Sequence, residues 1–434
     1  MNNAQITLWG NLIGAVSWLE DRNAAVFQYD PLFAESRIEL SPQKMPLRKV
    51  PYEFNSLAWN TFRGLPGLLA DSLPDKFGNA VIDAWLASQG RDTTSFNPVE
   101  RLCYIGTRGM GALEFQPEIL NTYSKNQAIE VARLVELSNQ VLSQRATLAG
   151  TLSGENDKTA LEDILRVGTS AGGARAKAIL AWHPITNEFR SGQINVSQGF
   201  EYWIIKFDGI TNNRDKEIAD PQGFGKIEYA YSLMAHAAGI EMMPCRLHLE
   251  GGRSHFMTKR FDRTAHGKKI HMQSLGALTH SDFNQPASFS YEQALQTMKT
   301  IGVSQNDIIQ QVLRTMFNIV GRNQDDHVKN IAFLMNQKGD WRISPAFDLT
   351  YAYNPAGDWT NLHQMSVNGK RTNFDSLDLI TFSEIGNVKP KTAKEMLEQV
   401  THAVKLWPHF AQQAGVDEKV IHQIQSTHRL SLLA

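Results

Sequence analysis

The stretch Gly321-Arg322-Asn323-Gln324-Asp325-Asp326-His327-Val328-Lys329-Asn330, followed by Ala346-Phe347-Asp348, decides how this chain is interpreted. Asp325 and Asn330 are five positions apart. The base and the metal-binding amide have this separation in the catalytic loop of protein kinases. Such a centre needs a second magnesium ligand, and Asp348 follows eighteen residues after Asn330. The stretch therefore predicts a phosphoryl-transfer site.

The intervening residues predict a hairpin that brings Asn330 and Asp348 together. Residues 331–335 are typical of a buried strand, residues 336–340 of a turn, and residues 341–344 of a returning strand. The two polar side chains would then lie at one end of the hairpin as oxygen ligands of a hard cation. At this point the alternative is an exposed turn rich in Asp and Asn, which is a common loop composition.

Composition indicates a globular protein with more than one structural unit. The chain has 434 residues, 42% hydrophobic and 20% charged, which is long for a single hydrophobic core. Its formal charge of −1 gives no net field toward nucleic acid or membrane. Two cysteines are too few for a disulfide framework and fit a reducing cytosol. Because the sequence has neither a leader pattern nor a long apolar run, we expect a cytoplasmic protein.

Residues 167–177 form a small-residue loop suited to phosphate binding. Glycine and alanine let backbone N–H groups approach phosphate oxygens, although the loop is not a Walker A sequence. It also contains Gly168-Thr169-Ser170-Ala171-Gly172, which fits the Gly-x-Ser-x-Gly pattern of hydrolases. A hydrolase nucleophile needs a strand before it and a helix after it. Here a helical pattern precedes and strand-like residues 178–182 follow, so we disfavour a hydrolase.

Further along the chain, a lysine, a glutamate and a linker follow in the order that kinases have. Lys206 lies in the apolar strand 202–207, where it needs an anionic partner such as a phosphate unless it extends to solvent. Glu228 begins a helix over 226–240 and could pair with that lysine, or remain a solvated surface residue. Residues 256–262 predict a strand that ends in a turn, the position at which kinases hold adenine.

With these motifs in place, the chain resembles the HipA family of serine/threonine kinases, the toxins of bacterial type II toxin–antitoxin modules. The resemblance rests on Phe62–Asp75, Gly168–Arg175 and Asp325–Asn330, and it extends over nearly the whole chain. It implies an α+β, two-lobed fold like that of protein kinases and PI3/4-kinases. The expected parts are an N-terminal subdomain over residues 1–150, a β-rich kinase N-lobe over 151–265 and an all-helical C-lobe with the catalytic loop over 266–434.

The resemblance also implies roles for individual residues. Asp325 becomes the general base, and it is preferred to the adjacent Asp326 because its spacing to Asn330 is that of kinases. Asn330 and Asp348 become the magnesium ligands. The ATP-binding residues would be Gly172, Gly173, Ala174, Arg175, Lys177, Lys206, Lys259, Arg260, Phe261, His327, Asn330 and Asp348.

Ser170 falls where family members are inactivated by autophosphorylation, and Thr169 is its neighbouring candidate. A phosphate there would add nearly two negative charges beside a site for ATP phosphates. Nucleotide binding would then be weakened by repulsion. The resemblance thus makes Ser170 the expected regulatory site.

The expected activity is ATP- and Mg²⁺-dependent phosphorylation of a protein by a growth-inhibiting toxin. The resemblance implies a HipB-like helix-turn-helix antitoxin, operator DNA bound only through that complex, and a protein target such as an aminoacyl-tRNA synthetase, glutamate–tRNA ligase in particular. Two alternatives remain: a kinase-like corepressor with secondary catalysis, and a small-molecule kinase. The complete set of Lys206, Asp325, Asn330 and Asp348 favours the protein kinase, because a decayed enzyme is expected to lose at least one.

Overall fold

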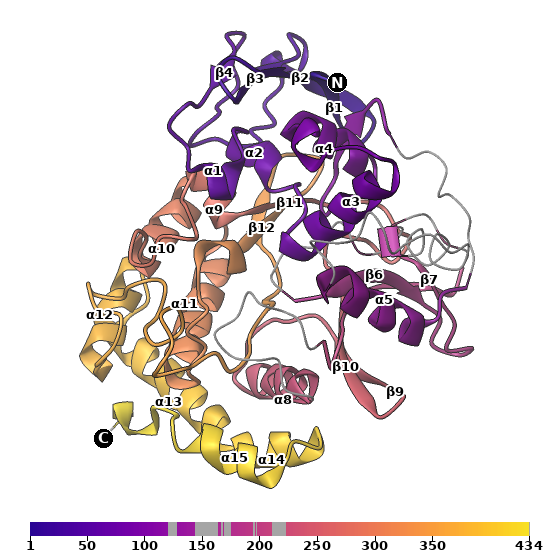
Figure 1. Cartoon of the computed structure of the whole chain (residues 1–434). Helices are drawn as coiled ribbons and strands as arrows, with labels where there is room; N and C mark the ends of the chain where they lie inside the picture. The colour runs from indigo at the N-terminus through magenta and orange to yellow at the C-terminus, as the bar shows by residue number, and fades with distance from the viewer. Residues whose placement is uncertain are drawn as a thin grey trace. The chain divides into compact units, whose positions relative to one another are not determined.

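The computed structural model describes residues 1–119, 128–143, 164, 165, 168, 175–193, 196, 198–210 and 223–433. These residues fold into two compact units. The first unit draws on Met1–Gln222 and His248–Met272, and the second on Gly223–Leu247 and Gln273–Ala434. Strands dominate the first unit and helices the second (Figure 1). The expected three-part division at residues 150 and 265 remains a prediction.

The first unit opens with a five-stranded antiparallel sheet of order β4-β3-β2-β1-β5. Every second residue of β1 is buried, which is typical of a sheet with one face on a core. Trp9 and Gly10 connect β1 to β2 with positive φ angles of 50° and 82°. A two-residue hairpin turn requires such angles if its twist is to match the right-handed twist of the strands. The strands are β1 (Asn3–Leu8), β2 (Asn11–Leu19), β3 (Ala24–Tyr29), β4 (Tyr52–Glu53) and β5 (Leu113–Gln116).

Short helices accompany this sheet, and α4 packs against both β1 and β5. Helix α4 begins with a capping box, in which the Asn97 side chain accepts from the Glu100 backbone N–H and Glu100 accepts from that of Asn97. The helices of the first unit are α1 (Trp59–Phe62), α2 (Gly67–Ala70), α3 (Lys76–Ser88), α4 (Pro98–Ile105) and α5 (Val131–Ser143), with 3-10 helices η1 (Phe33–Glu35) and η2 (Thr93–Ser95).

A second five-stranded sheet, of order β7-β6-β8-β10-β9, carries the expected lysine strand and linker. Its strands are β6 (Lys177–Trp182), β7 (Phe189–Ser191), β8 (Glu201–Lys206), β9 (Cys245–Glu250) and β10 (Arg253–Lys259). The strands predicted over 178–182, 202–207 and 256–262 are therefore confirmed. Side chains of α3 and α5 form one core with β6, β8 and β10; its members include Val81, Leu134, Leu180, Ile205 and Met257.

The second unit is mainly helical, and α11 lies at its centre with most residues after Asp307 buried. Helix α11 packs against α10 and α13 (Figure 1). The helices are α8 (Phe224–Ala237), α9 (Leu275–Thr279), α10 (Tyr291–Thr300), α11 (Gln305–Val320), α12 (Ser376–Ile385), α13 (Pro390–Lys405), α14 (Trp407–Gln413) and α15 (Glu418–Gln425), with 3-10 helices η3 (Val328–Asn330) and η4 (Leu430–Leu433).

This unit also contains the predicted hairpin, formed by β12 (Ala332–Met335) and β13 (Trp341–Ile343); β11 (His271–Ser274) is the third strand of the same sheet. Helix α8 packs against α13 and α14, so it belongs to the helical unit although it precedes β10 in sequence.

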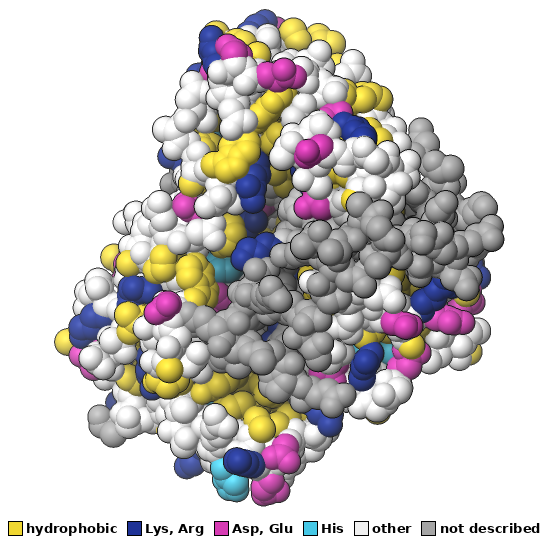
Figure 2. Space-filling view, viewed as in Figure 1, with side chains coloured by type: hydrophobic (Ala, Val, Ile, Leu, Met, Phe, Trp, Pro, Cys, Tyr) yellow, Lys and Arg dark blue, Asp and Glu magenta, His cyan; other side chains and the backbone are white. Residues whose placement is uncertain are grey.

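Surface charge and helix length agree with the composition. On the face drawn in Figure 2, basic and acidic side chains are interspersed and do not gather by sign, as a net charge of −1 suggests. Across the described stretches, every helix is too short or too polar to pass through a lipid bilayer.

A buried histidine of the second unit is held neutral. Tyr231 Oη donates to the Gly321 carbonyl at 2.6 Å, so the His428 Nε2 at 2.9 Å from Oη must carry the hydrogen between them. The remaining nitrogen, Nδ1, is buried without a hydrogen-bond partner among the described residues. Burial, aided by the nearby Arg322 charge, lowers the pKa of His428 to about 3.

We expect this histidine to make the protein less stable as the pH falls below about 6.5. An unfolded histidine protonates near that pH, whereas folded His428 stays neutral to about pH 3, so acid favours the unfolded state. At pH 5 the loss would be about 2 kcal/mol. His428→Gln keeps an N–H for Tyr231 but does not titrate, and it should flatten the decline in urea-unfolding midpoint between pH 7 and pH 5.

His422→Gln, on the exposed side of α15, controls for the loss of one histidine and should follow the wild type. If the unfolding midpoint of His428→Gln fell between pH 7 and pH 5 as steeply as that of the wild type, His428 would not be the neutral buried group proposed here.

Candidate functional site

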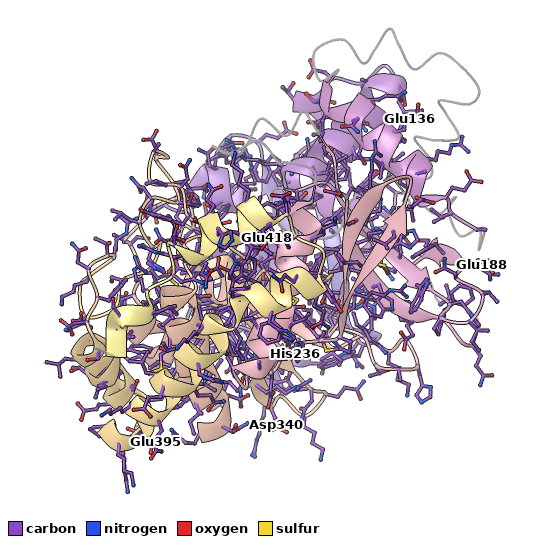
Figure 3. The ribbon with its side chains drawn as sticks, turned by 90° about the horizontal axis from the view of Figure 1, so that it is seen from below. Glu136, Glu188, His236, Asp340, Glu395 and Glu418 are labelled. Carbon is purple, nitrogen blue, oxygen red and sulfur yellow. The ribbon has the colours of Figure 1, made fainter. Side chains whose placement is uncertain are left out.

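The hairpin after the predicted catalytic loop is held by the pairing of its two strands and by hydrogen bonds within its turn. Strands β12 and β13 are antiparallel, and Phe333 pairs with Ile343. All four residues of β12 are buried. At the turn, Asn336 Oδ1 accepts from the backbone N–H groups of Lys338 and Asp340, at 2.8 and 3.1 Å. Asp340 marks this turn in Figure 3. The hairpin therefore fixes where the chain enters β12 and where it leaves β13.

The segments that flank the hairpin run side by side. Asn323 and Ala352 form a parallel β-bridge, with Ala352 N–H donating to the Arg322 carbonyl and Gln324 N–H to the Ala352 carbonyl, each at 3.1 Å. The side-chain amide of Asn323 donates to the Asp348 carbonyl at 3.4 Å. The backbone of Asp348 is thus hydrogen-bonded to the loop at Asn323, whereas the expected position of its side chain next to Asn330 remains a prediction. The Asp348 φ of 52° is unusual for a residue with a side chain, and such strain clusters at functional sites.

Asn330 and Asp325 are in direct contact. Asn330 closes the 3-10 helix η3, and its Nδ2 donates to the backbone carbonyl of Asp325 at 2.7 Å. Because the amide nitrogen is used in this way, Oδ1 is the atom that Asn330 can offer to a cation. Asp325, Asn330 and Asp348 are each partly exposed, so they are accessible to a ligand.

The donor chemistry of Asn330 and Asp348 fits Mg²⁺. An amide oxygen and a carboxylate are hard ligands, and Mg²⁺ is commonly held by one or two such groups together with phosphates and water. Among the residues that the structure describes, no three His, Cys, Asp or Glu side chains are arranged to hold a metal by themselves. A Mg²⁺ ion that arrives with a nucleotide needs no such cluster.

Asp326 has an environment that excludes it from contact with a substrate. Its side chain is buried, and Oδ1 accepts from the Gln364 N–H at 2.7 Å. Oδ2 accepts from Tyr291 Oη and from His363 Nδ1, both at 2.7 Å. A carboxylate that is enclosed and hydrogen-bonded at both oxygens cannot approach an acceptor hydroxyl. The geometry therefore leaves Asp325 as the candidate base.

The charge of Asp326 is maintained by a buried network. Arg429 Nη1 lies 2.8 Å from His363 Nε2 and donates to it, so His363 is neutral and donates from Nδ1 to Asp326. Burial lowers the pKa of His363, in agreement with this tautomer. Burial alone would raise the pKa of Asp326, but His363 and the hydrogen bonds from Tyr291 and Gln364 outweigh it and lower the pKa below its usual value.

Asp325 lies among aromatic side chains. Its carboxylate is 30% exposed, and Oδ1 accepts from Trp359 Nε1 at 2.7 Å. His327 Nε2 is 3.8 Å from the same oxygen. The His327 ring lies against Phe283 and Trp359, with centroids 5.3 and 6.5 Å away. His327 is therefore next to the candidate base, and its expected contact with a nucleotide remains a prediction.

In the first unit, Lys177 and Lys206 lie directly opposite each other on β6 and β8. Cross-strand partners share one face of a sheet, so the two cations are neighbours. Lys177 is buried, and its Nζ is 3.5 Å from Asp75 Oδ2. Lys206 Nζ lies 5.7 Å from the centre of the Phe256 ring. The register of the two strands therefore places two cations on one face, with Asp75 beside the buried one, and a phosphate group would be a further anionic partner for this face.

The linker residues have partners inside the first unit. Lys259 Nζ bonds to Glu201 Oε1 at 2.7 Å. Arg260 is completely buried; Nε and Nη2 each donate to Asp262 at 2.8 Å, and Nη1 donates to the Gly192 carbonyl. The Arg260 side chain is thus a structural group. Contacts of this segment with adenine would come from its backbone or from Phe261.

Asp262 gathers several donors at the end of the linker. Besides Arg260 it accepts from Arg263 Nη1 at 2.7 Å and from the Gly111 N–H at 2.8 Å. Burial opposes its charge, but the two guanidinium groups prevail and keep the pKa of Asp262 well below its usual range. This cluster fixes the loop at Gly111 to the end of the linker.

Other predicted residues have different outcomes. Ser170, Thr169 and Gly172–Ala174 lie outside the described residues, and Arg175 is buried.

Glu228 is 1% exposed, so its interpretation as a solvated surface residue is wrong. Sequence reasoning missed Trp359 and His363; the available signal was a Trp and a His within the mainly polar stretch 357–364.

Comparisons with known proteins identify the family. A model of the HipA-like C-terminal domain matches residues 169–407, which is more than half of the chain. A model of the HipA N-terminal domain matches residues 4–116. The chain therefore belongs to the HipA family, as its motifs predicted.

The fold agrees with this assignment. HipA of Shewanella oneidensis MR-1, from a toxin–antitoxin complex with HipB and operator DNA, matches with a TM-score of 0.65 and 15% identity over 99% of this chain and 96% of that one. The proinflammatory kinase CtkA of Helicobacter pylori matches with a TM-score of 0.34 and 11% identity over 54% of this chain and 89% of that one. Curated protein sequences gave no match. The predicted α+β fold, with a β-rich and a helical part, is confirmed. The expectation of an all-helical C-lobe is wrong, because β11, β12 and β13 form a sheet within residues 266–434.

The two adjacent aspartates should respond differently to substitution. Asp326→Asn places an amide where three buried donors converge, and we expect it to lower the free energy of unfolding by about 3 kcal/mol. Asp325→Asn affects a partly exposed side chain and should cost less than about 1 kcal/mol. Chemical denaturation of both variants measures the difference, and equal losses would argue against the separate roles.

Proposed function

We propose that this chain is an ATP- and Mg²⁺-dependent kinase that phosphorylates serine or threonine in a protein, and that it is the toxin of a HipA/HipB-like module. One arrangement carries the proposal. Asp325 is accessible and contacts Asn330, Asp348 is hydrogen-bonded to the same loop, and the competing carboxylate of Asp326 is enclosed. Family membership supports the same conclusion.

In this proposal Asp325 receives the proton of the acceptor hydroxyl while the hydroxyl oxygen bonds to the γ-phosphorus of ATP. The bond between that phosphorus and the bridging oxygen breaks, and ADP leaves. Asn330 Oδ1 and the Asp348 carboxylate would hold Mg²⁺, which would supply positive charge to neutralise the phosphates. Lys177 and Lys206 bind phosphate oxygens, and residues 259–261 hold the adenine.

The proposed regulation and partners follow the family. Phosphorylation of Ser170 would add charge beside the nucleotide phosphates and silence the enzyme. The Shewanella protein was solved with HipB and operator DNA, which supports a HipB-like antitoxin for this chain and DNA binding through it. The phosphorylated target would be a cytoplasmic protein, with an aminoacyl-tRNA synthetase such as glutamate–tRNA ligase as the first candidate.

Phosphoryl transfer can be tested with the full chain, ATP labelled at the γ-phosphate and Mg²⁺. We expect the chain to label itself, with the label lost in Ser170→Ala. The rate should fall about a thousandfold or more in Asp325→Asn, because the neighbouring carboxylate of Asp326 is enclosed and cannot replace the base. Chelation of Mg²⁺ should abolish transfer.

Asn330→Ala and Asp348→Asn should raise the Mg²⁺ concentration needed for half-maximal rate; Asn is chosen at 348 because it tolerates the positive φ. Asp340→Asn, at the exposed hairpin turn, is the matched control and should behave like the wild type. A chain that binds an antitoxin but transfers phosphate neither to itself nor to any protein would refute the kinase and favour the corepressor.

A further inference from the structure

We infer that Trp359 is a positioning residue for Asp325: its indole N–H holds Oδ1 of the carboxylate and leaves Oδ2 for the proton of the acceptor hydroxyl. The inference rests on the proposed kinase function, which it extends by one residue. It starts from the 2.7 Å contact between Trp359 Nε1 and Asp325 Oδ1. Indole N–H is a donor only, so Trp359 cannot take the proton in place of Asp325.

The segment that carries Trp359 is fastened to the catalytic loop on both sides of Asp325. On one side, Gln324 Nε2 donates to the Thr360 carbonyl at 3.0 Å, and Gln364 Nε2 donates to the Gln324 carbonyl at 3.3 Å. On the other side, Asp326 accepts from the Gln364 N–H. These bonds fix the indole relative to the carboxylate.

The segment is also fixed internally. Gln364 Nε2 also contacts the carbonyls of Trp359 and Leu362, so its two hydrogens are shared among three carbonyls, and its side chain bridges the segment internally as well as to Gln324. His363 is joined to both Asp326 and Arg429. The indole therefore projects from a stretch of backbone with little freedom to move.

This arrangement gives the two adjacent aspartates complementary tasks. Asp326 is buried and binds the segment 359–364, and that segment in turn presents an N–H group to Asp325. A carboxylate held at one oxygen keeps the other oxygen in a defined direction. Because a misplacement of about 1 Å at a reacting group can cost on the order of a hundredfold in rate, loss of this hydrogen bond should slow the chemical step.

Trp359→Phe tests the inference, since phenylalanine keeps an aromatic ring and removes the N–H. We expect the kcat for phosphoryl transfer to fall by about 10- to 100-fold, with the KM for ATP within about twofold of the wild type. Trp407→Phe is the matched control. It removes an indole N–H that donates to the Ile421 carbonyl at 3.1 Å in the same unit, and it should leave kcat unchanged.

A second measurement does not depend on activity. The chain has nine tryptophans, and the indole N–H signal that disappears from an NMR spectrum of ¹⁵N-labelled Trp359→Phe belongs to Trp359. In Asp325→Asn this signal should shift, because an amide replaces the carboxylate that accepts the hydrogen bond, whereas the Trp407 signal should stay in place.

The outcomes separate the two proposals. An unshifted Trp359 signal in Asp325→Asn, or a Trp359→Phe enzyme with wild-type kcat, overturns the positioning role. A wild-type chain that transfers no phosphate, with the expected signal shift, overturns the kinase and leaves the hydrogen bond as a structural contact only.

Discussion

The position of the loop around Asp325 depends on the hydrogen bonds made by the buried carboxylate of Asp326. Asp326 is adjacent in sequence to Asp325, the candidate base, yet its carboxylate accepts hydrogen bonds from Tyr291, His363 and the backbone of Gln364. A buried charge is costly unless it is fully hydrogen-bonded, and here each oxygen has a donor. The result is a fixed backbone at Asp325, with that residue's own carboxylate left accessible.

The first unit contains two groups of neighbouring charges that differ in sign. Around Asp262 the opposite charges are enclosed together, and Arg260 and Arg263 offset the burial of the carboxylate. On the sheet face with Lys177 and Lys206, two cations lie opposite each other, and Asp75 Oδ2 lies 3.5 Å from the buried Lys177 Nζ. The enclosed opposite charges suit a fixed structural joint, whereas the two lysines are proposed to bind phosphate oxygens.

The sequence was sufficient for the features that depend on local pattern. The apolar runs predicted β8, β10 and the β12–β13 hairpin, and the spacing of Asp325 to Asn330 located the loop. Contacts between distant residues were not predictable in this way. Trp359 and Asp325 are far apart in the chain, and no periodicity links them. The internal role of Arg260 had a signal, because Arg260 and Asp262 are two positions apart and would share one side of the strand predicted over 256–262.

In the second unit, the residues proposed for catalysis lie within one continuous stretch, from Arg322 to Gln364, which holds the candidate base, the two proposed magnesium ligands and Trp359. Outer supports such as Tyr291 and Arg429 come from elsewhere in the chain. Such a stretch can be inherited as a block. Recombination between relatives that exchanges it whole would transfer a matched set of groups, whereas a crossover within the hairpin would separate Asn330 from Asp348 and the base from the residue that orients it.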